Sequence, residues 1–236
     1  MRYALLFILT GLVSGTSFSQ QTPAPEQTRS VLILGGTAHL GTGDAIEDAA
    51  IGFRDGKIDF VGRTFQADKS KYDDTIDATG KQIYPGFIVT NTTLGLQEIG
   101  AVRATQDQYE VGTFRPNVRA IIAFNTDSEI TPTVRSNGVL MGQITPRSGV
   151  ISGASGVVQF DGWNWEDALI HESDGIHVYW PRMYERDHTG KLLSLKERDS
   201  YKKRVESLEA YLDQAVAYEN RLNEEEVDLR LSLIHI

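Results

Sequence analysis

The feature that most constrains this chain is an Asp55-Gly56 pair between two short segments of alternating apolar residues. Glycine accepts the positive φ that a tight two-residue turn requires, so this pair predicts a β-hairpin. Other apolar segments nearby also end at glycine-containing turns. The pattern predicts a small antiparallel sheet over residues 30–88. Its strands are expected at 31–34, 50–53, 57–61 and 75–78.

The first residues of the chain are typical of an export signal. Arg2 supplies a positive charge, residues 4–13 are apolar, and residues 17–19 form a small-x-small cleavage site. The apolar stretch is shorter than the ~20 residues that span a bilayer. We expect a signal peptide over 1–19 and a polar, proline-containing tether over 20–30. The mature protein is then expected to be periplasmic or secreted and not held by a membrane.

Composition excludes several chemistries. The 236 residues include no cysteine, so there can be no disulfide, thiol nucleophile, zinc–thiolate site or iron–sulfur cluster. The net charge of −9 argues against a nucleic-acid partner, which would require clustered Lys and Arg. A hydrophobic share of 40% is sufficient for a buried core. The expected partner is a small-molecule substrate, on grounds that the motifs below supply and composition does not. Oligomeric state stays open.

After residue 88 the pattern changes to alternating strands and helices. The pattern predicts a βαβ unit in a parallel sheet, made of apolar residues at 119–124, a short helix over 128–136 and a strand over 139–144. The segment 148–158 is rich in small residues, where glycines permit close packing or a close approach to a ligand. Apolar residues at three- and four-residue steps from Tyr201 to Leu222 predict a long amphipathic helix.

Three segments in residues 31–88 together resemble the opening of the amidohydrolase superfamily, most closely its imidazolonepropionase-like branch. They are VLILGGT from Val31, IGFRDGKIDFVG from Ile51, and IDATGKQIYPGFI from Ile76. The resemblance implies an α/β chain with additional β structure. Residues 31–88 would form the N-terminal part of a composite β-sandwich, and 89–230 the first part of a (β/α)8 barrel. A metal site at the carboxyl-terminal mouth of the barrel is also implied.

The chain departs from the family pattern where the first metal ligands are expected. In metal-dependent members the Pro-Gly-Phe-Ile segment continues as Asp-x-His-x-His, because histidines two residues apart on a strand point to one side. Here Asn91 and Thr93 stand at those positions, and neither is a good zinc ligand. We assign no metal ligand and no catalytic residue. A divalent metal such as zinc would belong to the full-length protein.

Polar residues after predicted strands are the candidate site. Asn91, Thr93 and Asp127 are expected to line the barrel mouth and bind substrate, although Asp127 could instead cap the following helix. A metal-binding loop containing His171 and His177 is a weaker alternative, because their spacing matches no known ligand motif. His39 and His188 are expected to make local hydrogen bonds. Trp163 and Trp165 would form either a pocket wall or ordinary core.

The last residues, 231–236, are expected to be a non-native tail, because LSLIHI is what the end of a transposase-based sequencing adaptor encodes. The barrel is expected to be incomplete, since a (β/α)8 barrel alone takes ~250 residues. The leading functional hypothesis is an exported amidohydrolase-like hydrolase of carbon–nitrogen bonds other than peptide bonds, whose site is incomplete in this chain. The alternative is a non-catalytic periplasmic binding or partner protein that has lost the metal site.

Overall fold

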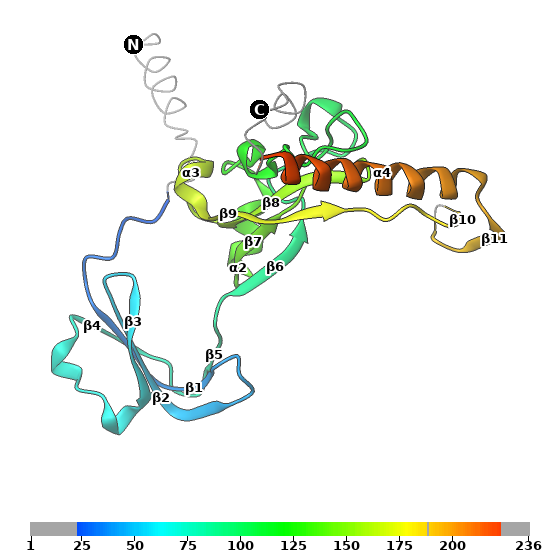
Figure 1. The fold of residues 1–236 in the computed structure, drawn as a ribbon. Coiled ribbons are helices and arrows are strands. Elements are labelled where there is room, and N and C mark those ends of the chain that lie inside the picture. Colours follow the sequence, from blue (N-terminus) through cyan, green and yellow to red (C-terminus); the bar gives the residue numbers. More distant parts are fainter. Residues whose placement is uncertain (1–22, 188, 223–236) are drawn as a thin grey trace, which may run out of the picture. The chain divides into compact units, whose positions relative to one another are not determined.

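The computed structural model describes residues 23–187 and 189–222 (Figure 1). The predicted signal peptide, His188 and the predicted tail over 231–236 lie outside the described residues. The chain divides into two compact units. The first contains Met1–Gly86 with Asp161–Trp163, and the second contains Phe87–Phe160 with Asn164–Ile236.

The first unit is a five-stranded sheet in which β1 is central. Its order is β3-β2-β1-β4, and β5 also pairs with β1. The predicted hairpin is confirmed, because Asp55 and Gly56 join β2 to β3 with φ angles of 49° and 70°. The strands are β1 Val31–His39, β2 Ala45–Arg54, β3 Lys57–Arg63, β4 Asp74–Asp77 and β5 Gln82–Ile83.

The expectation of a wholly antiparallel sheet is wrong in one respect. Strands β4 and β5 both run parallel to β1. The chain between β3 and β4 contains two short 3₁₀ helices, η1 Thr64–Gln66 and η2 Lys69–Lys71. This connection carries the chain from one edge of the sheet to the other side of β1, so β4 re-enters in the same direction. A local turn signal such as Asp-Gly cannot reveal such a crossover.

Both faces of β2 are covered. Leu32, Leu34 and Ala50 form one buried cluster, whereas Ala49 and Ile51 belong to another with Ala38. Because neighbouring residues of a strand point to opposite faces, Ala50 and Ile51 place these clusters on the two sides of the sheet. Burial of this kind contributes roughly 1.5–3 kcal/mol for each large aliphatic side chain.

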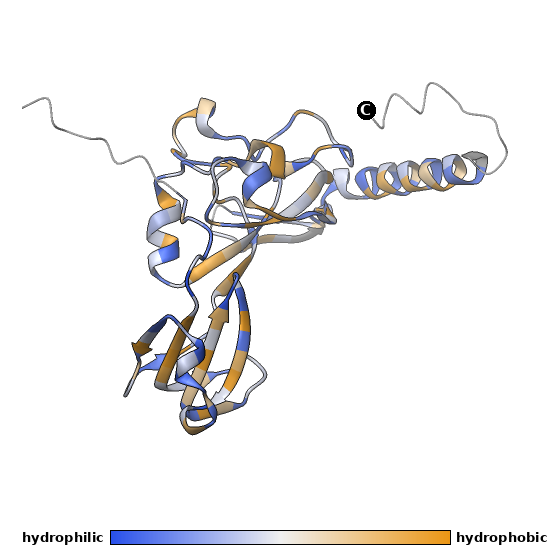
Figure 2. Cartoon of the chain, turned by 90° about the vertical axis from the view of Figure 1, so that its left-hand side faces the viewer, coloured by the Kyte–Doolittle hydropathy of each residue, from blue (hydrophilic) through white to orange (hydrophobic). Residues whose placement is uncertain are grey.

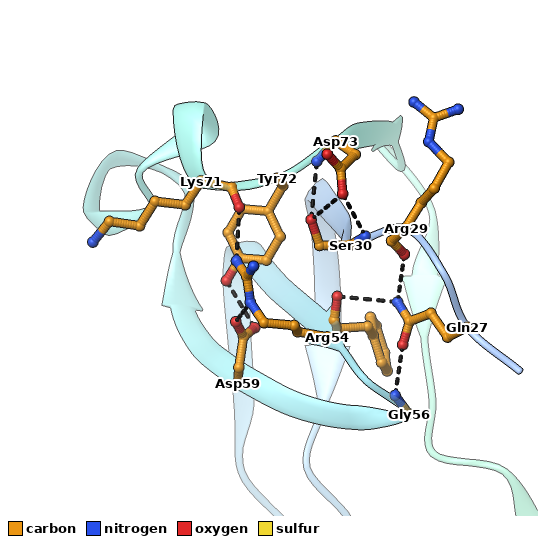
Figure 3. A network of polar contacts seen from close by, with 10 residues as sticks. Gln27, Arg29, Ser30, Arg54, Gly56, Asp59, Lys71, Tyr72 and Asp73 are labelled. Carbon is orange, nitrogen blue, oxygen red and sulfur yellow. Dashed lines mark hydrogen bonds and ion pairs between the residues drawn. The ribbon is translucent and has the colours of Figure 1, made fainter.

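Polar contacts join the ends of the strands in the first unit (Figure 3). Asp73 Oδ2 accepts hydrogen bonds from both the backbone N–H and the hydroxyl of Ser30, each at 2.8 Å. Asp59 accepts a hydrogen bond from the Tyr72 hydroxyl at 2.8 Å and pairs with Arg54 at 3.1 Å. These bonds favour the carboxylate form, so they lower the pKa of Asp73 and of Asp59.

The second unit contains a four-stranded sheet of order β6-β7-β8-β9. Strands β6 and β7 are parallel, while β7, β8 and β9 are successively antiparallel. A separate antiparallel pair is formed by β10 and β11. The strands are β6 Phe87–Thr92, β7 Val139–Ile144, β8 Ile151–Gln159, β9 Leu169–Val178, β10 Tyr184–Arg186 and β11 Leu192–Glu197.

Helices connect and cover these strands. The predicted short helix is present as α2, and the predicted long helix is confirmed as α4 over 24 residues. Figure 2 shows both hydrophobic and hydrophilic residues along α4. No helix among the described residues has the length and apolarity needed to span a membrane. The helices are η3 Arg103–Thr105, η4 Ala120–Ala123, α2 Ile130–Ser136, α3 Trp165–Ala168 and α4 Asp199–Leu222.

The parallel pairing expected for a βαβ unit occurs, but its first strand is β6. The apolar segment that was expected to supply this strand instead forms η4, which packs against β8. Gly153 explains the close approach, because a Cβ atom there would lie 2.4 Å from the carbonyl oxygen of Val118. The Val118 carbonyl also accepts a hydrogen bond from Ala154 N at 2.7 Å. The small residues of β8 therefore serve tight packing.

The described chain is of mixed α/β class, rich in sheet, and this part of the fold prediction is confirmed. The core of the second unit includes Ile121, Phe124, Ile144 and Val158. The composite sandwich and the incomplete barrel remain predictions, as do the domain boundaries at 30, 88 and 230.

Candidate functional site

Asn91 lies close to the carboxyl end of β6, where that strand departs from regular pairing with β7. The register between the two strands shifts between Val89 and Thr92. Asn91 has a φ of 53°, a left-handed conformation that asparagine adopts more readily than most residues. Its N–H donates to the side chain of Gln143 at 2.9 Å. The strand end thus turns Asn91 toward polar groups that follow β7.

Arg147 is the main partner of Asn91. Its Nη1 donates to Asn91 Oδ1 at 2.7 Å, and its Nη2 donates to the backbone carbonyl of the same residue. Nη1 also donates to the Tyr179 hydroxyl oxygen at 2.6 Å. One guanidinium therefore holds the end of β6 and the residue that follows β9.

Two further side chains complete the arrangement. Thr145 is fully buried, and its hydroxyl lies 3.2 Å from Asn91 Oδ1 and 3.1 Å from the Thr92 carbonyl oxygen. Gln143 donates through Nε2 to the carboxylate of Asp174 on β9. We call Asn91, Gln143, Thr145, Arg147 and Tyr179 the Asn91 cluster. It lies where the carboxyl ends of two parallel strands meet.

His177, on β9, belongs to the electrostatic surroundings of the cluster. Burial lowers its pKa, and the positive charge of Arg147 lowers it further, whereas the carboxylate of Asp174 opposes the shift. All three effects act on one imidazole whose ordinary pKa is close to 6.5. The ring is consequently neutral at neutral pH, in the form that can accept a proton.

Of the three predicted substrate-binding residues, only Asn91 is part of this network. Among the residues that the structure describes, no hydrogen bond connects Thr93 or Asp127 to the Asn91 cluster. The carbonyl of Thr93 accepts a hydrogen bond from Leu96 N at 2.9 Å, and Asp127 N donates to Asn125 Oδ1 at 3.1 Å. Substrate binding by these residues stays a prediction.

The histidines considered as metal ligands lie on a strand and not in a loop. His171 and His177 are both in β9, and the intervening Glu172 pairs with Arg119. No group of three His, Asp or Glu side chains suited to hold a metal occurs within residues 23–187 and 189–222. His39 makes the expected local contact, because its Nε2 lies 2.7 Å from Gln82 Oε1.

The two predicted aromatic candidates differ in their surroundings. Trp165 packs against the core of the second unit, which is the ordinary role considered for it. Trp163 is 61% exposed and is grouped with the first unit. Neither residue belongs to the Asn91 cluster.

Arg147, Gln143 and Tyr179 were not predicted. Gln143 and Arg147 lie on either side of the end of β7. Polar residues at strand ends were the signal that indicated Asn91, and the same signal could have indicated these two. Tyr179 follows an antiparallel strand, and its position beside Arg147 depends on the pairing of β8 with β9. No local pattern in the sequence carries that information.

Comparisons with known proteins bear on the fold. No family model matches the chain, and no curated protein matches it. The crystal structure of an amidohydrolase from Thermotoga maritima MSB8 superposes with a TM-score of 0.69 and 19% sequence identity. The superposition covers 86% of this chain and 54% of the other, so this chain spans about half the length of that amidohydrolase.

Two other hydrolases match only small portions of the chain. A molinate hydrolase matches with 32% identity and a TM-score of 0.26 over 28% of this chain and 15% of that one. An ochratoxinase from A. niger matches with 22% identity and the same TM-score over 32% and 17%. These two superpositions cover too little of either chain to show a shared fold. The Thermotoga superposition shows that this chain shares its fold with about half of that amidohydrolase.

Proposed function

We propose that the full-length form of this protein is an exported, amidohydrolase-like hydrolase of carbon–nitrogen bonds other than peptide bonds. The observation that carries the proposal is the position of the Asn91 cluster. Its polar side chains converge at the carboxyl ends of the parallel strands β6 and β7. In barrel enzymes of this kind, active sites form at that end of the strands. Export is proposed from the sequence of residues 1–19.

The residues of this chain do not fit the metal that the family implies. Asn91 and Thr93 stand where histidine ligands are expected. Both oxygens of Asn91 accept hydrogen bonds from the Arg147 guanidinium, and a fixed cation there would repel a metal ion. Zinc in the full-length protein would therefore need ligands other than residues 91 and 93.

The Asn91 cluster can bind and polarise a substrate without a metal ion. Hydrolysis adds water across the carbon–nitrogen bond, which yields a carboxylate and an amine, and negative charge develops on the carbonyl oxygen. The guanidinium of Arg147 is a fixed donor of the kind that stabilises such charge, and the Tyr179 hydroxyl oxygen, which accepts from it at 2.6 Å, helps to hold it in place. Neutral His177 can accept a proton.

A second candidate is a binding protein that keeps the fold without catalysis. The replacement of two expected histidines by Asn91 and Thr93 favours it, because it removes ligands that a metal-dependent hydrolase would need. This candidate and the hydrolase differ in one measurable respect, since both would bind a small molecule and only the hydrolase would turn it over.

The test compares the full-length gene product with two arginine variants. We expect hydrolysis of N-acyl amino acids or cyclic amides by the full-length protein, and loss of at least about tenfold in kcat/KM for Arg147→Met. Arg103→Met is the matched control, because Arg103 is exposed and its Nη1 donates to the Gln106 carbonyl at 2.9 Å. Substrate binding without turnover would favour the second candidate.

Two further results would correct the proposal. The 236-residue chain by itself is expected to show no hydrolase activity. Turnover by this chain at enzyme-like rates would contradict the expectation that its site is incomplete. Stoichiometric zinc in the purified full-length protein, lost in His171→Asn or His177→Asn, would contradict our description of the metal chemistry.

A further inference from the structure

A cleft between α4 and the loops of the second unit is lined by basic side chains. It has a volume of 520 Å³ and lies against Thr113, Gly149 and Val150 on one side and the start of α4 on the other. A second hollow of 290 Å³ shares Gly149, Val150 and Arg204 with the first. Sites for small molecules usually occupy about 300–1,000 Å³. We call the two together the α4 cleft.

The face of α4 that lines the cleft is polar where a packed helix would be apolar. It is lined by Ser200, then by Lys203 and Arg204 three and four residues later, and then by Ser207, four residues after Lys203 and three after Arg204. The next residue, Leu208, is buried against Val150 and Ile151. Leu208 is the buried residue of this part of the helix, and the first two turns before it present cations and hydroxyls to the cleft.

The helix is anchored at the far end of this face. Tyr211 stacks on Phe114 with ring centroids 4.7 Å apart and an angle of 15° between the rings. Phe114 and Tyr211 both pack against the cluster that contains Leu208. The cations at the start of α4 are thus held beside the loop that contains Thr113, so the cleft is a feature of the packed unit.

More cations lie around the second hollow, which is lined by Arg182 and Arg198 as well as Arg204. No acidic side chain is among the described residues that line either part of the α4 cleft. Within the described chain, none of these arginines nor Lys203 forms an ion pair. Four cations without acidic partners among the described residues, in a protein of net charge −9, form a concentrated positive region.

Arg115 adds a buried cation directly behind the loop residue Gly149. It is only 5% exposed, and its Nη2 donates to the carbonyl and hydroxyl oxygens of Ser148 at 2.7 and 2.6 Å. Its Nε and Nη1 are buried and have no hydrogen-bond partner among the described residues. Gly149, which lines both parts of the cleft, lies against this guanidinium, since a Cβ there would be 3.0 Å from Nη2. Glu110 is the acidic residue whose charge acts on Arg115.

We propose that the α4 cleft binds the phosphate group of a small phosphorylated molecule. Lysine and arginine donate charge-assisted hydrogen bonds to phosphate oxygens, and arginine does so with two parallel bonds. Coulomb attraction grows with the charge of the ligand, so four unpaired cations favour a dianion over a single carboxylate. The hydroxyls of Ser200 and Ser207 supply additional donors on the same face. Tyr179 of the Asn91 cluster borders the second hollow, but none of the cations of the α4 cleft belongs to that cluster, and the proposal does not depend on the proposed hydrolase function.

The test is calorimetric titration of the 236-residue protein with inorganic phosphate at low ionic strength, with acetate as the comparison anion. We expect a Kd for phosphate of about 1 mM or tighter and clearly weaker binding of acetate. Lys203→Glu and Arg204→Glu should each weaken phosphate binding by about tenfold or more. The matched control is Lys202→Glu, which makes the same charge change on the adjacent residue of α4, outside the cleft lining.

Three outcomes would overturn the proposal. They are no heat of binding up to about 10 mM phosphate, equal affinity for acetate, and weakening by Lys202→Glu as large as by Lys203→Glu. The last result would mean that diffuse charge, and not the cleft, attracts the anion. Circular dichroism of each variant checks that α4 is retained. Arg204→Glu provides a second reading should one variant fail to fold.

Discussion

The contact between Arg147 and Asn91 offers the sharpest test of the candidate site. Arg147→Met removes the guanidinium and keeps a side chain of similar reach. The change eliminates the hydrogen bonds to Asn91 Oδ1 at 2.7 Å and to the Tyr179 hydroxyl at 2.6 Å, as well as the bond to the Asn91 carbonyl. Asn91 would then keep its left-handed conformation with fewer contacts to hold it.

The magnitude follows from the number and exposure of these bonds. A hydrogen bond to a charged group contributes about 1.5–3 kcal/mol when it is well shielded, whereas an exposed ion pair contributes about 0–1 kcal/mol. Arg147 is half-buried and Asn91 and Tyr179 are exposed, so water replaces much of what is lost. We expect Arg147→Met to lower the free energy of unfolding by about 1–2 kcal/mol. Arg103→Met should change it by less than about 0.5 kcal/mol.

A double-mutant cycle isolates the contact itself. The free energy of unfolding is measured by urea denaturation for the original protein, Asn91→Ala, Arg147→Met and the double variant. The two residues are in direct contact, so their coupling energy should be about 1 kcal/mol. A coupling energy indistinguishable from zero would refute the reasoning that Arg147 holds the end of β6.

Three other predictions concern individual residues. Gly153→Ala should lower the free energy of unfolding by about 2–4 kcal/mol in urea denaturation, because φ at Gly153 is +123° and the new Cβ would lie 2.4 Å from the Val118 carbonyl oxygen. The control is Gly175→Ala, whose Cβ would have no other atom within 4 Å and which should lower the free energy of unfolding by less than about 1 kcal/mol. An NMR titration should give His177 a pKa below its ordinary 6.5, and Arg147→Met should raise that pKa. Because the unfolded state protonates first, the stability due to His177 is fully present above its unfolded pKa of about 6.5 and is lost as the pH falls from there through the lower folded pKa. Asp73 has a lowered pKa, so its contribution to stability is present above its unfolded pKa of about 3.9 and is lost as the pH falls through the folded pKa. Asp73→Asn should therefore weaken the fall in melting temperature at acid pH. An unchanged fall would contradict the role of the contact between Asp73 and Ser30.

Local signals in the sequence were reliable where the structure depends on neighbouring residues. The turn at Asp55-Gly56 needs two consecutive positive φ angles, and that requirement is visible in the residue types. The long helix α4 follows from apolar residues at helical spacing. The segment 119–124 shows the limit of such signals. A short apolar run suits a buried strand or a buried helical turn equally, and packing against Gly153 decides for the turn.

The candidate site was predictable only in part, for the same reason. Asn91 could be predicted because it stands where metal-dependent amidohydrolases have a histidine and because it lies close to the end of a strand. Its partners Arg147 and Tyr179 lie 56 residues further along the chain and 32 residues beyond that. The parallel pairing of β6 with β7 and the antiparallel pairing of β8 with β9 bring the three together.

The sequence by itself determined the hairpin of the first unit, the amphipathic helix, the exclusion of thiol chemistry and the replacement of two expected histidines by Asn91 and Thr93. Each depends on one residue type or a short spacing. Only the tertiary structure decided which cation faces Asn91 and which cations line the α4 cleft. Those arrangements join residues far apart in the sequence, and the energy of a charge depends on what surrounds it after folding.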